Sequence, residues 1–212
     1  MGRFITFEGI EGSGKTTQIQ MLSNHLEERG IEHTLTREPG GTAIGDQIRK
    51  LVLNPANTDI TPGCELLLYA AARAQHLEQV IRPALQEGRV VLCDRYLDAT
   101  LAYQGFGRGL ELDMILMLHA LEVLAMRPDH TILFDIDART ALERARERDV
   151  STSPDETRFE QESLEFHERV RSGYLELARK EPGRFVVVDA LGTPAEVQVR
   201  VQAAVDRFLG AP

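Results

Sequence analysis

Short runs of apolar and β-branched residues alternate along the chain with longer segments in which apolar residues recur every three or four positions. Continuous apolar runs are typical of strands covered on both faces, and the longer spacing is typical of amphipathic helices. The runs predict strands at residues 4–7, 33–36, 90–93, 131–134 and 185–188. The spaced pattern predicts helices at residues 19–30, 44–53, 61–88, 113–126, 139–148, 160–180 and 194–209.

This alternation is typical of an α/β protein with a parallel β-sheet of about five strands, helices on both faces and right-handed crossovers. A length of 212 residues suffices for one core, so we expect a single domain over residues 1–212. Pro83 lies in the last turns of the third helix and is expected to kink or end it. The polar segment 149–155 is interpreted as a surface loop between two helices.

Composition narrows the possible partners. The chain has 24 basic and 33 acidic residues, a formal charge of −9, so no overall positive field attracts nucleic acid or an anionic membrane. Polyphosphate ligands would therefore need a local cluster of Arg and Lys. The two cysteines, Cys64 and Cys93, are interpreted as buried, reduced thiols. With no signal region and no apolar run long enough to span a bilayer, we expect a cytoplasmic protein.

A phosphate-binding loop follows the first predicted strand. Residues 9–16 match G-x-x-x-x-G-K-[ST] at every fixed position, between a strand and a helix. The glycines allow backbone amides to surround an anion, Lys15 reaches the β- and γ-phosphates, and the Thr16 hydroxyl can bind Mg²⁺. The residues predicted to bind ATP are Gly9, Ile10, Glu11, Gly12, Ser13, Gly14, Lys15, Thr16 and Thr17.

Asp94 and Arg95 follow the strand predicted at residues 90–93. Ligands of open parallel sheets bind at the carboxyl ends of the strands. Asp94 is thus a second candidate for Mg²⁺, and Arg95 can bridge donor and acceptor phosphates with its planar guanidinium. The alternative is an ion pair with a purely structural role.

Tyr69 and Arg73 are four residues apart on a predicted helix, with three alanines between them. They share a face and leave room for a planar base, on which Tyr69 can stack and to which Arg73 can donate. From spacing alone, however, the better interpretation is a tyrosine at the edge of the core and a solvated arginine.

Arginines crowd the helix predicted at residues 139–148: Arg139, Arg144, Arg146 and Arg148. Glu143 and Glu147 are interleaved with them, which is also typical of a solvated face. Because the phosphate loop has no arginine of its own, a lid that closes over ATP is the favoured interpretation.

At its motifs the chain resembles bacterial thymidylate (dTMP) kinase, a member of the P-loop nucleoside-monophosphate kinase superfamily, over essentially its whole length. The motifs are Phe7 to Thr17, Thr36 to Thr42, Asp94-Arg95-Tyr96, Ala102 to Gly105 and Arg127-Pro128-Asp129. The resemblance implies a three-layer P-loop kinase fold with a short lid at about residues 139–160 and a homodimer. It also implies transfer of the γ-phosphoryl group of ATP to dTMP, with Mg²⁺, giving dTDP and ADP for dTTP biosynthesis.

The resemblance also implies roles for individual residues. Glu11 would meet the 3′-hydroxyl side of the deoxyribose. Tyr69 would stack on thymine and Arg73 would contact its O4, which reverses the interpretation from spacing. Arg95 would hold the acceptor phosphate, with Arg49 and Pro39 nearby. The remaining residues implied for the base and sugar pocket are Thr100, Tyr103 and Gln104, with Tyr103 crowding out a 2′-hydroxyl.

The family carries its catalytic arginine either in the phosphate loop or in the lid. This chain has Glu11-Gly12-Ser13 in the loop and so resembles the lid-arginine type. Its segment 148–158 is longer than a compact lid, which leaves Arg144, Arg146, Arg148 and Arg158 as candidates. We assign catalysis to Arg148 and an additional ATP contact to Arg144.

A phosphate acceptor is mostly dianionic at pH 7 because its second pKa is about 6, so it needs no general base.

One rival to this function is another small-molecule kinase of the same fold, acting on CMP, AMP or a deoxynucleoside. A rival from a different class is a nucleotide-dependent switch or ATPase. A GTP switch usually carries an Asn-Lys-x-Asp motif, and no Asn-Lys pair occurs here.

Overall fold

The computed structural model describes residues 2–152 and 156–210, with the side chains of all of these except 148–152. Its centre is a five-stranded sheet in the order β2-β3-β1-β4-β5, in which every pairing is parallel. The strands are β1 (Arg3–Glu8), β2 (His33–Arg37), β3 (Val90–Asp94), β4 (His130–Asp135) and β5 (Phe185–Asp189). The predicted parallel sheet is thereby confirmed.

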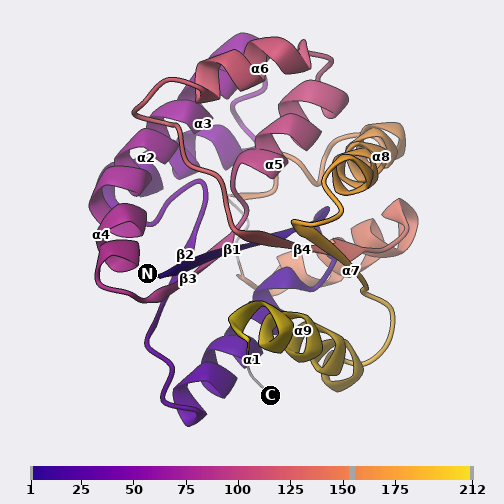
Figure 1. Ribbon diagram of the computed structural model, residues 1–212. Coiled ribbons are helices and arrows are strands. Elements are labelled where there is room, and N and C mark those ends of the chain that lie inside the picture. The colour runs from indigo at the N-terminus through magenta and orange to yellow at the C-terminus, as the bar shows by residue number, and fades with distance from the viewer. Residues whose placement is uncertain (1, 153–155, 211–212) are drawn as a thin grey trace.

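Helices cover both faces of this sheet and make the three layers expected from the sequence. Figure 1 shows α1 and α9 on one face, with α3, α5 and α8 on the other. The α-helices are α1 (Lys15–Glu28), α2 (Ala43–Leu53), α3 (Pro62–His76), α4 (Arg82–Gln86), α5 (Leu97–Thr100), α6 (Leu112–His119), α7 (Ala138–Thr152), α8 (Leu164–Lys180) and α9 (Pro194–Leu209). Because β1 lies between two other strands and is covered on both sides, its Phe4, Ile5 and Phe7 are all buried.

Two segments have π-helical geometry, η1 (Leu77–Ile81) and η2 (Leu101–Gly107). The first interrupts the long helix predicted at residues 61–88, just before Pro83. Proline lacks the N–H of a regular helix and clashes with the preceding turn, so a widened turn accommodates it. The second was not predicted; it carries Tyr103 and Gln104, both of which are buried.

Three predicted boundaries were wrong. The helix expected to reach residue 126 ends at His119. Leu121 and Val123, which follow it, are exposed, so they provide no buried apolar contact that would stabilise a longer helix. Helix α7 continues to Thr152, so residues 149–152 are helical rather than loop, and residues 153–155 lie outside the described part. Helix α8 begins at Leu164, where the Ser163 side chain caps the Phe166 amide.

Of the two thiols expected to be buried, Cys93 is buried but Cys64 is exposed. Cys64 lies in the first turn of α3, on the outer side of the molecule. Within residues 2–152 and 156–210, no helix has the length and apolar character needed to cross a membrane.

Candidate active site

A cavity of about 490 Å³ lies at the carboxyl ends of β1, β2 and β3. The register aligns Phe7 and Arg37 with Asp94, so the loops that follow these three strands meet at one edge of the sheet. A volume of this size suits a small-molecule ligand. The predicted residues on its wall are Glu11, Gly12, Gly14, Lys15, Thr16, Thr17, Pro39, Arg49, Tyr69, Arg73, Asp94, Arg95, Thr100, Tyr103 and Gln104.

The phosphate loop has the conformation that its glycines permit. Gly9, Gly12 and Gly14 have φ angles of 143°, 72° and 86°. The Lys15 ammonium lies inside the loop and donates to the Gly9 carbonyl at 3.0 Å and the Ile10 carbonyl at 2.9 Å. Burial, assisted by the charge of Arg95, lowers the pKa of Lys15 to about 8. A phosphate in the loop would add a negative charge next to this ammonium.

Thr16 and Asp94 meet beside the loop. The Thr16 hydroxyl donates to Asp94 Oδ2 at 3.3 Å. Asp94 Oδ1 is buried and has no hydrogen-bond partner among the described residues. A buried, ionisable oxygen without a donor, next to a hydroxyl, fits a divalent cation. Mg²⁺ typically binds one or two protein oxygens and completes its shell with water and phosphate oxygens, so the residues present suit it.

Arg95 and Glu11 form an ion pair between the loop after β3 and the phosphate loop. Arg95 Nη2 donates to Glu11 Oε1 at 2.8 Å, and the Tyr103 hydroxyl lies 2.7 Å from each Glu11 oxygen. Burial alone would raise the pKa of Glu11, but Arg95 chiefly, with His167 and Lys15, holds it below its usual range. Arg95 has a φ of 69°, the one positive value among the described non-glycine residues.

Arg73 is buried, so the solvated arginine favoured by spacing alone is wrong. Its Nε donates to Glu38 Oε2 at 2.7 Å, and its Nη1 donates to Thr100 Oγ1 at 3.0 Å and to His119 Nε2 at 2.6 Å. Burial and the charge of Arg73 lower the pKa of His119 to about 4, which keeps Nε2 an acceptor. Glu38 also accepts from His76 at 2.9 Å. The guanidinium is thus fixed on the cavity wall.

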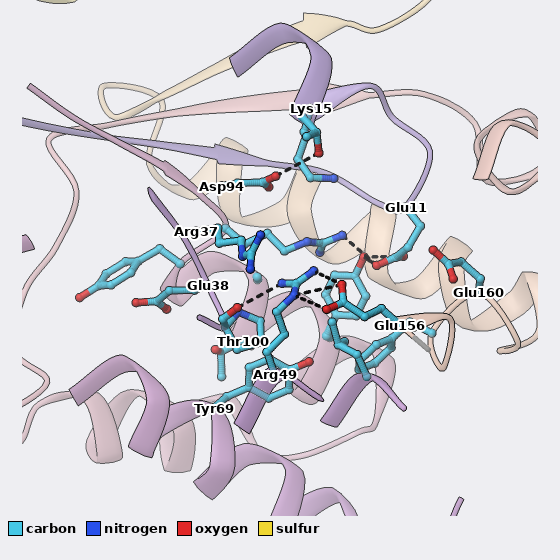
Figure 2. A pocket seen from close by; sticks show the side chains of 18 of the residues that line it. Glu11, Lys15, Arg37, Glu38, Arg49, Tyr69, Asp94, Thr100, Glu156 and Glu160 are labelled. Carbon is cyan, nitrogen blue, oxygen red and sulfur yellow. Dashed lines mark hydrogen bonds and ion pairs between the residues drawn. The ribbon is translucent and has the colours of Figure 1, made fainter. Parts of the chain in front are cut away.

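Arg49 is bound by a carboxylate that the sequence did not indicate. Its Nε and Nη2 donate to Glu156 at 3.1 and 2.8 Å, and its Nη1 donates to the Pro39 carbonyl at 3.1 Å. Figure 2 shows Lys15 and Asp94 at one end of the cavity and Tyr69 at the other, with Arg49 and Glu156 between them. A cationic group therefore lies between the phosphate loop and an aromatic side chain.

Gln104 is held at the base of the cavity by Glu65, a fully buried carboxylate that also binds Arg158 Nη1 at 2.6 Å. Of the candidate lid arginines, Arg158 is therefore part of a buried ion pair. Arg144 donates to the Ala190 carbonyl at 3.2 Å and does not line the cavity. Arg146 is exposed, and the side chain of Arg148 lies outside the described residues.

The residues that sequence reasoning missed are mainly partners of those it found: Glu38, Glu65, His119, Glu156 and His167. Glu38 belongs to a motif that the sequence analysis singled out and could have been found there. The others have no local signal, because each resembles an ordinary polar residue of a helix or loop.

A lysine-bearing phosphate loop, with a hydroxyl and a carboxylate beside it that suit a cation, opens into an arginine-lined cavity. This combination defines a P-loop phosphotransferase with a small-molecule acceptor.

The sequence model of the Thymidylate kinase family matches residues 7–201. The thymidylate kinase of Trichlorobacter lovleyi is 56% identical over 210 residues, 99% of each chain. That of Syntrophotalea carbinolica is 55% identical, over 100% of this chain and 99% of the relative.

A crystal structure of thymidylate kinase from Ehrlichia chaffeensis has the same fold, with a TM-score of 0.76 at 33% identity. The match covers 97% of this chain and 98% of that one. The chain therefore belongs to the thymidylate kinase family, which uses ATP, and its activity is the conversion of dTMP to dTDP. The resemblance stated from the motifs, and the enzyme activity that it implied, are confirmed.

Proposed function

We propose that the chain, as one domain over residues 1–212 with a lid at about residues 139–160, carries out this reaction in the cytoplasm for dTTP biosynthesis. The γ-phosphoryl group of ATP passes to dTMP, and the products are dTDP and ADP. The observation that carries the proposal is the single cavity that joins Lys15 of the phosphate loop to Tyr69 and Arg73.

The donor binds to the phosphate loop. Residues 9–17 surround the phosphates of ATP, with Lys15 at the β- and γ-phosphates. Arg144 adds a contact on the outer side of the nucleotide. Its position supports this, since it lies against the Ala190 carbonyl, beyond the wall of the acceptor cavity.

Thr16 and Asp94 would hold Mg²⁺, which would supply neutralisation of the charge on the phosphates. The unpartnered Asp94 Oδ1 supports this assignment. Asp94→Asn is expected to raise the Mg²⁺ concentration for half-maximal turnover at least about tenfold, which corresponds to about 1.4 kcal/mol. An unchanged Mg²⁺ dependence would contradict it.

The acceptor occupies the inner part of the cavity. Tyr69 stacks on thymine and Arg73 donates to its O4; Glu11 meets the 3′-hydroxyl, and Tyr103 leaves no room for a 2′-hydroxyl. Arg95 and Arg49, with the Pro39 turn, hold the phosphate. Thr100 and Gln104 complete the pocket. The rigid Arg73–Glu38 pair supports this, because a fixed donor distinguishes bases better than a mobile one.

The acceptor phosphate is itself the nucleophile, and its second pKa of about 6 leaves it mostly dianionic at pH 7. Catalysis then consists of aligning two anions and neutralising charge as the phosphoryl group passes. Lys15 and Arg95 supply two of the cationic groups. Closure of the lid excludes water and so suppresses hydrolysis of ATP.

The chain is of the lid-arginine type, with Arg148 as the lid residue that contacts the transferring phosphoryl group. The burial of Arg158 against Glu65 supports this choice by engaging that arginine elsewhere. Single-turnover rates of Arg144→Ala, Arg146→Ala, Arg148→Ala and Arg158→Ala test it. Arg148→Ala is expected to lose about 10³–10⁵ in rate, and a larger loss in another variant would contradict the choice.

The chain forms a homodimer. Exposed apolar side chains on neighbouring helices support this: Leu67 on α3 is 60% exposed, and Met114 and Met117 on α6 are 40% and 67% exposed. The two helices are linked through Arg73 and His119. Light scattering is expected to give twice the chain mass, and Leu67→Glu is expected to reduce it to one chain. A wild-type monomer would contradict the dimer.

A further inference from the structure

His167 lies on α8, is fully buried and faces acceptors on both sides. Its Nε2 is 2.9 Å from the Phe159 carbonyl oxygen. Its Nδ1 lies 3.4 Å from Glu11 Oε2 and makes no hydrogen bond among the described residues. A carbonyl and a carboxylate only accept, so the contacts are favourable on both sides when each ring nitrogen carries a hydrogen. The geometry therefore suits a ring whose Nδ1 carries a hydrogen toward Glu11.

Glu11 is consequently held from three directions. Arg95 reaches it from the loop after β3, Tyr103 from η2, and His167 from α8. The pKa of Glu11 is below its usual range although burial opposes this, and His167 is the next contributor after Arg95. Glu11 is thus a fixed acceptor whose ionised form is stabilised by Arg95 and His167.

Arg95 and His167 differ in their access to the cavity. Arg95 lines the cavity, and under the proposed function it also binds the acceptor phosphate. His167 is fully buried behind Glu11 and does not line the cavity. When the guanidinium of Arg95 turns to a phosphate, His167 and the Tyr103 hydroxyl remain to orient the Glu11 carboxylate.

We propose that His167 is a positioning residue that holds Glu11 for the 3′-hydroxyl of the acceptor deoxyribose. This rests on the proposed function, in which Glu11 meets that hydroxyl. His167 itself does not touch the substrate. Through the Phe159 carbonyl it also connects Glu11 to the end of the proposed lid region.

Two matched variants distinguish this role from a structural one in which His167 only anchors Phe159. The amide nitrogen of asparagine occupies a position like that of Nδ1, and the amide nitrogen of glutamine a position like that of Nε2. His167→Asn therefore keeps the donor toward Glu11, and His167→Gln keeps the donor toward Phe159.

The experiment compares kcat/KM for dTMP with kcat/KM for 2′,3′-dideoxythymidine monophosphate, which lacks the 3′-hydroxyl. We expect His167→Gln to reduce the wild-type preference for dTMP about tenfold, because it removes the donor that faces Glu11 at 3.4 Å. His167→Asn is expected to keep that preference within about twofold. Equal losses on both substrates in His167→Gln, with the preference unchanged, would overturn the inference.

Nitrogen-15 NMR of the His167 ring in the wild-type protein tests the inference without a variant. Nδ1 is expected to carry a hydrogen that faces Glu11, and a ring with a bare Nδ1 would overturn the inference. Failure of this inference can be distinguished from failure of the proposed function. A wild-type protein without dTMP turnover contradicts that function. Turnover of dTMP with no preference for the 3′-hydroxyl leaves the kinase intact and overturns the Glu11 assignment together with the role of His167.

Discussion

Arg49 donates to both carboxylate oxygens of Glu156, which lies 107 positions further along the chain. Its remaining nitrogen Nη1 donates to the Pro39 carbonyl. Glu156 is therefore bound by a group that is proposed to bind the acceptor phosphate. A carboxylate and a phosphate both bind a guanidinium through two oxygens, and they compete for it.

Glu156→Gln is accordingly expected to lower KM for dTMP about threefold to fivefold. Both side chains are partly exposed, and an ion pair of this kind contributes about 0–1 kcal/mol. Steady-state kinetics with varied dTMP checks this. Glu28→Gln, an exposed residue of α1, is the control for a change in net charge. An increase in KM would mean that Glu156 assists acceptor binding.

Glu38→Gln is expected to destabilise the protein strongly, because it leaves the buried Arg73 without a counter-charge. Breaking one side of a buried pair typically costs about 3–5 kcal/mol. The free energy of unfolding from denaturant titration measures the effect, and kcat/KM for dTMP should fall with it. Glu87→Gln, which affects an exposed pair with Arg89, is the control. A loss no greater than that of the control would contradict the importance of Glu38.

Two glycines of the phosphate loop should respond differently to alanine. A Cβ at Gly12 would lie 1.8 Å from the Ala141 carbonyl oxygen on α7, whereas one at Gly14 would meet nothing within 4 Å. Both have positive φ, which costs an alanine roughly 1–2 kcal/mol. Gly12→Ala should therefore lower Tm, measured without nucleotide, by clearly more than Gly14→Ala. Equal decreases would mean that α7 does not pack closely on the loop.

Glu8 gives a prediction for the pH dependence of stability. Burial, and next the charge of Asp98, raise its pKa from 4.5 to about 8. The folded state then holds a proton that the unfolded state loses near pH 4.5. The resulting stabilisation is complete below this pH and is lost as the pH rises to about 8.

Glu8→Gln resembles the protonated form and should not show this loss. The difference in unfolding free energy between wild type and variant is expected to change with a slope of up to about 1.4 kcal/mol per pH unit between pH 5 and 8. Denaturant titrations across this range measure the slope. Parallel curves for the two proteins would mean that Glu8 is ionised throughout.

Discrimination between dTMP and dUMP rests on a single methyl group. One methyl in an apolar pocket contributes about 1–3 kcal/mol, or roughly 10–200-fold in kcat/KM. We expect the preference for dTMP to fall in this range. Equal kcat/KM values would mean that the methyl group meets no complementary surface near Tyr69.

The sheet and the phosphate loop could be predicted from the sequence because their signals are local. The apolar run at Val90 to Cys93 by itself indicates a strand that is buried on both faces. The glycines of the phosphate loop by themselves indicate the turn that they form. The cavity wall around Tyr103 was harder. Segment 97–107 contains Gly105 and Gly107, which are unfavourable in helices, and it is helical because it packs against α8.

Apart from Glu38, the partners of the site residues could not be predicted, for a related reason. His167 and Glu11 are distant in sequence, as are Arg49 and Glu156, and neither pair leaves a pattern that a spacing rule detects. Arg73 illustrates the same limit. The spacing predicted that Arg73 lies beside Tyr69 and is exposed to solvent. Its burial depends on contacts with Glu38 and His119, which come from other elements.

The most direct test of dTMP as the phosphoryl acceptor is release of ADP from ATP and Mg²⁺ in a coupled assay. The acceptors dTMP, dUMP, CMP, AMP and thymidine are compared in parallel. We predict rapid turnover with dTMP, slower turnover with dUMP and background rates with the others. Preference for a different acceptor, or ADP release that does not depend on any acceptor, would contradict the central assignment.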